Sequence, residues 1–256
     1  QRSVKQAEKF GVECIVPFNV VKIERKINDQ NIPYFTVYDD NMESIDSLSV
    51  LLATGISYRS LRAKNLYHFI GNGVSYGSPV LTQNYENKTV MVIGGANSAG
   101  QAAMYLSRCN NCKVILVVRG STLIDKMSQY LCTRINNNSH IQVMYESEVI
   151  EVNGNITLET VNVITDGVIK TIDCNQIYVL IGAEPKTKWL SDLVKTDDNG
   201  FILASEDNCI PLQAHKGLFV AGDVRANSIK RVSNAVGEGA RVINSIHKYL
   251  STLGVS

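Results

Sequence analysis

The sequence has little net charge of either sign. Its 256 residues include 25 lysines and arginines against 24 aspartates and glutamates, which gives a formal net charge of +1. A charge this small produces no long-range field that favours nucleic acid or an anionic membrane surface. We therefore expect no nucleic-acid and no membrane partner. We expect a small-molecule partner, held by a local group of side chains and backbone amides.

The sequence also lacks long apolar runs. None approaches the roughly 18 consecutive apolar residues that cross a bilayer. The polar start Gln1-Arg2-Ser3-Val4-Lys5 lacks the apolar core of a signal peptide. These two absences predict a cytoplasmic location. The first residue is not methionine, which is compatible with a fragment or a processed product.

A disulfide framework is absent as well. The cysteines stand mostly alone within segments patterned as helix or strand, which favours reduced thiols; they are Cys14, Cys109, Cys112, Cys132, Cys174 and Cys209. Cys109 and Cys112 form a C-x-x-C, but a structural zinc site needs two further ligands and no second pair is present. The histidines are isolated and are expected to be surface or packed residues: His68, His140, His215 and His247. We predict no metal and no catalytic side chain.

What is present suits a globular protein. Hydrophobic residues make up 45% of the chain and charged residues 19%. The length allows one large domain or two modest ones at about 100–200 residues each, and we expect two. The N-terminal part predicts a helix that ends at Gly11, a hairpin or meander over 13–24 and 32–37, and a buried strand at 48–53. A linker is predicted at 57–79.

From Lys88 the pattern alternates between strand and helix. After a first strand and a glycine turn come a helix at 98–107, a strand at 114–118, a helix at 124–135 and a strand at 141–145. This alternation predicts parallel strands joined by crossover helices. Antiparallel strands are expected at 156–172 around Asp166-Gly167, and a strand buried on both faces at 177–181. Beyond Pro185 we expect a short helix near Trp189, a strand at 217–221 and a helix at 228–250.

The first strand of that region leads into a candidate dinucleotide turn. A strand, a glycine turn and a helix in this order aim the backbone amides of the helix N-terminus at a pyrophosphate. The predicted binding residues are Gly94, Gly95, Ala96, Asn97, Ser98 and Ala99. Ala96 stands where the middle glycine of G-x-G-x-x-G is expected, so its methyl group meets the pyrophosphate and lowers the affinity. The alternative is a structural turn that binds nothing.

Arg119 follows the second strand of this region. An acidic residue at that point bonds the ribose 2′-hydroxyl of NAD, whereas a cation accommodates the 2′-phosphate of NADP. Arg119 therefore favours NADPH, with NADH still open, and Lys126 is a second candidate cation. The alternative for Arg119 is a solvated charge at the end of a strand.

Four further motifs are distributed along the chain: Leu52-Ala53-Thr54-Gly55, Gly71-Asn72-Gly73-Val74-Ser75-Tyr76, Ile181-Gly182-Ala183-Glu184-Pro185, and Val220-Ala221-Gly222-Asp223-Val224 followed by Lys230-Arg231. Together they resemble, over nearly the whole chain, the thioredoxin-reductase-like, FAD-dependent pyridine nucleotide-disulfide oxidoreductase family. The resemblance implies an α/β fold in which a Rossmann-like, three-layer NAD(P)H-binding domain (83–186) is inserted into a partial FAD-binding domain of the same type (1–82 and 187–256).

The resemblance also implies cofactor contacts. Those outside the glycine turn are Thr54, Gly55, Gly182, Gly222, Asp223, Lys230 and Arg231. In the family the aspartate bonds the ribitol chain of FAD, and the following helix points its positive end at the flavin ring. Asp223 has the alternative of a turn residue before a helix, and Lys230-Arg231 that of a charge pair at a helix start.

The chain departs from the family at the redox cysteines, because those positions read Gly77-Ser78-Pro79-Val80. Together with residues 98–103 and 127–131, this resembles a cysteine-free branch that lacks a dithiol relay. The implied function is a flavin-dependent NAD(P)H oxidoreductase that passes hydride to flavin and on to an unidentified acceptor. The alternative is a nucleotide-sensing or regulatory module with little turnover. A homodimer is expected from family likeness alone.

A second departure concerns the first βαβ unit of the flavin domain, which supplies the glycine turn for the FAD pyrophosphate. By family likeness it precedes Gln1. We therefore expect this polypeptide to bind FAD weakly or not at all, and the intact protein to bind it.

Overall fold

The computed structural model describes residues 2–79, 83–205 and 215–254. The chain divides into two compact units, unit 1 (Gln1–Ser57 and Glu184–Ser256) and unit 2 (Tyr58–Ala183). The inserted domain at 83–186 stays a prediction from the sequence. Among the described residues, no helix is long and apolar enough to cross a membrane.

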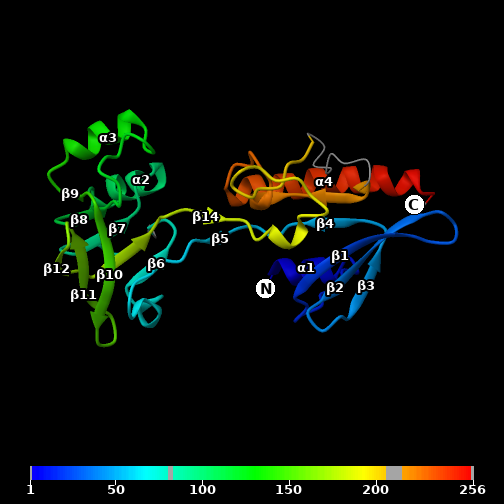
Figure 1. Cartoon of the computed structure of the whole chain (residues 1–256), viewed down its shortest axis with the longest axis horizontal. Coiled ribbons are helices and arrows are strands. Elements are labelled where there is room, and N and C mark those ends of the chain that lie inside the picture. Colours follow the sequence, from blue (N-terminus) through cyan, green and yellow to red (C-terminus); the bar gives the residue numbers. More distant parts are fainter. Residues whose placement is uncertain (1, 80–82, 206–214, 255–256) are drawn as a thin grey trace. The chain divides into compact units, whose positions relative to one another are not determined.

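Unit 2 is built on a parallel sheet of five strands in the order β6-β13-β7-β8-β9 (Figure 1). The strands are β6 (Val74–Tyr76), β13 (Gln176–Val179), β7 (Thr89–Ile93), β8 (Lys113–Val117) and β9 (Ile141–Met144). The three inner strands, β13, β7 and β8, are mostly apolar and buried, as a sheet covered on both faces requires.

Three layers result from this covering. On one face the core joins the sheet to the helices α2 (Asn97–Leu106) and α3 (Gln129–Asn136). On the other it joins the sheet to a three-stranded antiparallel sheet of β10 (Ser147–Gly154), β11 (Leu158–Thr165) and β12 (Val168–Asp173). The predicted three-layer Rossmann-like fold is therefore confirmed, as is the turn at Asp166-Gly167, where both residues have positive φ.

The linker predicted at 57–79 is wrong. Its residues form β6, which pairs with β13 at the edge of the sheet, and the 3-10 helix η1 (Leu66–Phe69). Leu66, Phe69 and Val74 are buried in the core of unit 2. The prediction failed because apolar residues are too few and too irregularly spaced there to show a period.

Unit 1 contains an antiparallel sheet and a two-stranded parallel sheet. The first consists of β1 (Val20–Ile27), β2 (Pro33–Asp39) and β3 (Ser44–Ser47), and the second of β4 (Val50–Leu52) and β15 (Leu218–Val220). Its other elements are α1 (Arg2–Glu8), η2 (Lys188–Leu190), η4 (Gly222–Val224) and α4 (Val232–Thr252). The chain crosses between the units in two short strands that pair with each other, β5 (Ser57–Tyr58) and β14 (Ala183–Glu184).

Two helices begin later than the sequence predicts. α3 begins at Gln129, because Thr122 Oγ1 accepts the backbone N–H of Ile124 in a turn at 3.2 Å and delays the helix. α4 begins at Val232, after the loop that follows η4.

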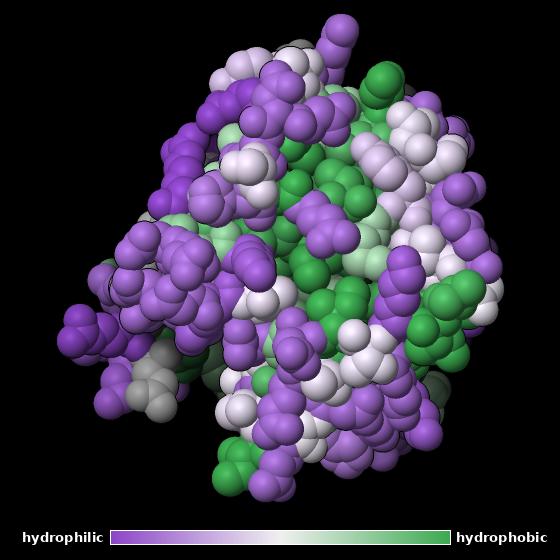
Figure 2. All heavy atoms as spheres, turned by 90° about the vertical axis from the view of Figure 1, so that its left-hand side faces the viewer, coloured by the Kyte–Doolittle hydropathy of each residue, from purple (hydrophilic) through white to green (hydrophobic). Residues whose placement is uncertain are grey.

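Figure 2 shows one face of the molecule, on which hydrophilic residues surround a band of apolar ones.

Candidate functional site

The glycine turn after β7 needs a residue without a side chain. Gly94 has φ 143°, and its N–H donates to the carbonyl of Val117 at 3.0 Å, which joins the turn to β8. A Cβ atom on Gly94 would overlap the carbonyl oxygen of Leu180. Glycine at position 94 therefore allows the chain to pass from the end of β7 into α2 in a tight turn.

The N-terminus of α2 faces solvent at the carboxyl edge of the sheet. Ala96 is its N-cap residue in extended conformation (φ −107°, ψ 178°), and Ala96, Asn97 and Ser98 are exposed. No side chain caps the first turn. Backbone N–H groups at such an end attract anions, and the binding of a pyrophosphate here stays a prediction.

Residues of this segment also have structural roles, among them the predicted Asn97 and Ala99 and the neighbouring Gly100. The Asn97 side chain accepts the backbone N–H of Ser128 through Oδ1 at 2.8 Å, which fixes the start of α3. A Cβ atom on Gly100 would come within 2.7 Å of Met127 Sδ, so this glycine allows α2 to pack closely against the following segment. Ala99 is fully buried.

Arg119 is exposed and lies two residues beyond the end of β8. It lines a hollow of about 390 Å³ within unit 2, together with Glu146, Ser147, Glu148, Ile164, Asp166 and Gly167. Two backbone hydrogen bonds hold the acidic segment beside the arginine: Glu146 N–H donates to Gly120 O at 3.1 Å, and Ser147 N–H to Val118 O at 3.1 Å. Lys126 is exposed and does not line this hollow.

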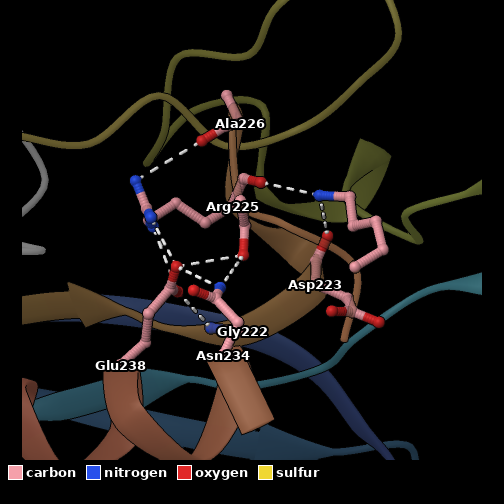
Figure 3. A network of polar contacts seen from close by, with 8 residues as sticks. Gly222, Asp223, Arg225, Ala226, Asn234 and Glu238 are labelled. Atoms are coloured by element: carbon pink, nitrogen blue, oxygen red, sulfur yellow. Dashed lines mark hydrogen bonds and ion pairs between the residues drawn. The ribbon is translucent and has the colours of Figure 1, made fainter. Parts of the chain in front are cut away.

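In unit 1, β15 leads into a tight loop that carries Asp223. Gly222 has φ 79° and begins the 3-10 helix η4. The Oδ1 atom of Asp223 is buried and has no hydrogen-bond partner. Figure 3 shows this carboxylate directed away from the polar network formed by Arg225 and Glu238. Asp223 thus offers a buried, unused acceptor.

Glu238 of α4 anchors that loop. Its carboxylate accepts Gly222 N–H at 2.8 Å, Ser228 Oγ–H at 3.0 Å and Asn234 Nδ2–H at 2.9 Å, and it forms a two-point ion pair with Arg225 (Figure 3). Glu238 is only 3% exposed. Burial raises the pKa of its carboxyl, but the hydrogen bonds from Arg225, Gly222, Asn234 and Ser228 outweigh burial and lower that pKa to about 2.

Lys230 and Arg231 have separate surroundings. Lys230 Nζ donates to the carbonyls of Asp223 at 2.7 Å and Arg225 at 2.9 Å, and it lies 4.1 Å from the centroid of the Phe201 ring. Burial lowers the pKa of Lys230. Arg231 is the exposed N-cap residue of α4. Lys230 therefore holds the backbone of the Asp223 loop.

The remaining predicted residues lie at the crossings. Thr54 is exposed and Gly55 has φ 64°, in the segment between β4 and β5. Gly182 has φ 98°, and its carbonyl accepts the N–H of Arg59 at 3.0 Å. Gly222, Asp223 and Lys230 meet in one loop, and Gly94 to Ala99 meet at one turn.

The sequence interpretation missed Arg225, Ser228, Asn234 and Glu238. A signal for Glu238 was available, since it lies four residues from both Asn234 and the buried Val242 on one face of α4. An acidic residue on a buried helix face needs a cationic partner. Its partner, Arg225, follows the Asp223 motif directly.

The cysteines show no sign of activation. Cys112 and Cys174 are buried, and burial raises their pKa to about 11 and about 12, so neither thiol ionises at neutral pH. Cys14, Cys109 and Cys132 are also free, while Cys209 lies outside the described residues. In the part of the chain that the structure describes, no cluster of three candidate metal ligands occurs.

A comparison against known protein families assigns the chain to one of them. The family model described as pyridine nucleotide-disulphide oxidoreductase matches residues 3–239. The chain belongs to this family. Within the pyridine nucleotide-disulphide oxidoreductases it is thioredoxin-reductase-like, as the four motifs predict.

Individual members of the family give the same result. The chain is 31% identical over 209 residues to the thioredoxin reductase of Treponema pallidum, covering 81% of this chain and 66% of that protein. It is 32% identical over 232 residues to the thioredoxin reductase of Mycoplasma genitalium, with 88% and 69% covered. The chain thus spans about two thirds of the length of these curated relatives.

Solved structures of the family share the fold. Thioredoxin reductase from Streptococcus pyogenes matches with a TM-score of 0.76 and 28% identity, covering 97% of this chain and 78% of that one. Thioredoxin reductase from Giardia duodenalis has the same TM-score of 0.76 at 23% identity, covering 97% and 79%, and supports the fold alone.

Proposed function

We propose that this chain is part of an FAD-dependent NAD(P)H oxidoreductase that transfers reducing equivalents to an acceptor without a dithiol relay of its own. The observation that carries the proposal is the buried Asp223 oxygen without a partner, held at the end of β15 by a fixed loop. A buried acceptor without a donor is costly unless a ligand supplies one. When bound, FAD would accept hydride from the nicotinamide and release electrons to the acceptor.

The residues present fit a flavin. Asp223 Oδ1 would accept a ribitol hydroxyl, and Gly222 leaves the approach without a side chain. Glu238 and Lys230 do not need to touch the ligand, because they fix the backbone on either side of Asp223. The helix α4 is twenty-one residues long, and its N-terminus carries a positive partial charge in the same unit.

The residues of unit 2 fit a pyridine dinucleotide. The amides at the N-terminus of α2 would receive the pyrophosphate, and the turn at Gly94 and Gly95 keeps the backbone close to it. The hollow beside Arg119 would receive the adenosine ribose. We assign the proposed NAD(P)H-binding role to unit 2 and the proposed flavin-binding role to unit 1.

The absence of a dithiol relay in this proposal comes from the sequence. Gly77, Ser78, Pro79 and Val80 stand where family members carry C-x-x-C, and Val80 lies outside the described residues. The buried Cys112 and Cys174 do not replace the missing thiols, because their pKa values are raised. We therefore propose an acceptor that takes electrons from the flavin directly.

The test is a binding and turnover experiment with the 256-residue chain and the intact protein. Titration with NADH and NADPH, followed by nicotinamide fluorescence, is expected to show saturable binding. The 256-residue chain is expected to bind FAD weakly or not at all. In the intact protein, titration with FAD followed by flavin fluorescence is expected to show binding that Asp223→Asn weakens at least about tenfold, since the neutral amide is a poorer acceptor. Asp192→Asn, which removes an exposed carboxylate elsewhere in unit 1, is the matched control. If neither NADH nor NADPH binds saturably at millimolar concentration, the proposal is contradicted.

A second candidate is a nucleotide-sensing module with little turnover, which Ala96 supports. Its methyl group lies at the exposed N-cap of α2, where a phosphate would approach. NAD(P)H oxidation by the intact protein, in the presence of FAD and a generic acceptor such as ferricyanide, separates the two. Turnover supports the oxidoreductase, and binding of the nucleotide with negligible turnover supports the sensor.

A further inference from the structure

The hollow beside Arg119 contains more negative than positive charge. Arg119 is the one cation among its lining residues, whereas Glu146, Glu148 and Asp166 are carboxylates. The sequence led to Arg119 alone, because the acidic residues come from other segments: Glu146 directly before β10, Glu148 in β10, and Asp166 in a hairpin turn. At neutral pH the four side chains sum to a charge of −2.

Backbone contacts fix this arrangement. Glu146 follows β9 and has φ 47°, and its N–H donates to the carbonyl of Gly120, directly after Arg119. Ser147 N–H donates to Val118 O, directly before Arg119. On the other side, Asp166 lies in the turn between β11 and β12, and Ser147 Oγ contacts Thr165 Oγ1 at 2.6 Å. The carboxylates are thus held around the end of β8.

The end of the second strand after the glycine turn is where a dinucleotide fold distinguishes NAD from NADP. A 2′-phosphate carries a charge of about −1.5 to −2 at neutral pH. Three carboxylates repel it, and one exposed arginine does not offset them. A ribose with a free 2′-hydroxyl carries no such charge and donates a hydrogen bond, for which a carboxylate is the preferred acceptor.

We propose that this site prefers NADH over NADPH, and that Glu146 and Glu148 determine the preference. This inference rests on the proposed function, since it requires the glycine turn to bind a pyridine dinucleotide. It differs from the expectation drawn from Arg119 alone, which favours NADPH with NADH still open. Arg119 is then available for the adenine ring or the adenosine ribose, both of which NADH and NADPH share.

The experiment compares dissociation constants of NADH and NADPH for the 256-residue chain at low ionic strength. NADH is expected to bind at least about tenfold more tightly, as several like-charge interactions near a protein surface allow. In Glu146→Gln/Glu148→Gln the ratio is expected to narrow about fivefold or more, chiefly because NADPH binds more tightly. Raising the salt concentration is expected to narrow the ratio in the parent chain and to affect the variant less.

The matched control is Glu159→Gln/Asp173→Asn. It removes two exposed carboxylates from the same antiparallel sheet, so the net charge changes equally while the hollow keeps its lining. The ratio is expected to stay as in the parent. Thermal unfolding of both variants verifies that they fold.

The possible failures differ from one another. If NADPH binds as tightly as NADH or more so, the inference is overturned while the proposed function stands. If NADH is preferred but the ratio is the same in both double variants, Glu146 and Glu148 do not determine it and the assignment is overturned. If neither nucleotide binds saturably, the proposed function fails and takes the inference with it.

Discussion

At the residue scale, Glu238 stabilises the loop of the candidate flavin site, although it does not need to touch the ligand. Its carboxylate collects hydrogen bonds from residues 222, 225, 228 and 234, so it joins the loop to α4. We predict that Glu238→Gln lowers the free energy of unfolding by about 3 kcal/mol, because it leaves Arg225 half-buried without its counter-charge. Denaturant unfolding measures this change.

The reciprocal variant tests whether the two residues act as a pair. Arg225→Gln is expected to destabilise by a similar amount, and the double variant Glu238→Gln/Arg225→Gln by clearly less than the sum. Additive effects would contradict a coupled pair.

The low pKa of Glu238 predicts a pH dependence. The folded-state pKa of about 2 lies below the usual 4.5, so the stabilising contribution is fully present above about pH 5. It is lost as the pH falls through the range between these two pKa values. The parent chain is expected to lose about 3 kcal/mol more than Glu238→Gln over that range, as urea unfolding at several pH values measures. Parallel losses in both chains would show that Glu238 does not titrate with a depressed pKa.

Ala96 allows a prediction in the opposite direction. Its extended backbone suits glycine, and glycine is at least as favourable as alanine at an N-cap. We predict that Ala96→Gly tightens NADH binding several-fold without lowering stability, because it removes the methyl group from the path of the pyrophosphate.

The control for that variant is Ala240→Gly, at an exposed position inside α4. It is expected to lower stability by about 1 kcal/mol and to leave NADH binding unchanged. Weaker NADH binding by Ala96→Gly would show that the methyl group does not obstruct the ligand.

At the element scale, sequence patterns predicted the continuous parts of the fold. The strand before Gly94, the helix after it and the strand at 114–118 were predicted because each has a dense and regular apolar pattern. The edge strand β6 was missed, since three residues of strand carry too little pattern. The first turn predicted for α3 is wrong because contacts of Thr122 and Asn97, which no local pattern shows, delay the helix.

The candidate site was predictable only where local geometry defines it. The glycine turn and the Asp223 loop each lie within one stretch of sequence, and the structure places their residues together. The carboxylates that line the hollow with Arg119, and Glu238, which pairs with Arg225, come from distant segments, so only the folded chain brings them together. Sequence reasoning therefore named single residues of each site and missed the charges that surround them.

At the glycine turn between β7 and α2, alanine substitutions at the two neighbouring glycines are expected to destabilise the protein by different amounts. Gly94→Ala is expected to destabilise by about 2–3 kcal/mol and to weaken NADH binding, because φ 143° and the Leu180 carbonyl oppose a Cβ atom. Gly95→Ala is expected to cost about 1 kcal/mol or less, since its Cβ atom meets only the Val118 side chain, at 3.0 Å. Thermal unfolding and NADH titration of both variants check this. Equal costs would show that the backbone at Gly94 is not constrained.

At the scale of the whole molecule, each described core cluster draws its residues from a single unit. Two clusters belong to unit 2 and two to unit 1. The only tryptophan of the sequence, Trp189, lies in η2 of unit 1, where its indole N–H donates to the carbonyl of Lys186 at 2.8 Å. Tryptophan fluorescence therefore reports on unit 1, while circular dichroism reports on both units.

This separation predicts a selective effect of ligand. At a concentration of 100 times its dissociation constant, a ligand stabilises the unit that binds it by about 2.7 kcal/mol, which corresponds to a shift of about 10 °C for a unit of this size. NAD⁺ suits the experiment because it does not absorb the tryptophan emission. We predict that NAD⁺ raises the midpoint temperature of the part of the circular dichroism transition that comes from unit 2, and leaves the midpoint temperature of the tryptophan signal nearly unchanged. Glu238→Gln is expected to lower the midpoint temperature of the tryptophan signal and not that of unit 2. Equal shifts of both signals in both experiments would contradict this prediction, because they would mean that the two units unfold as one cooperative body.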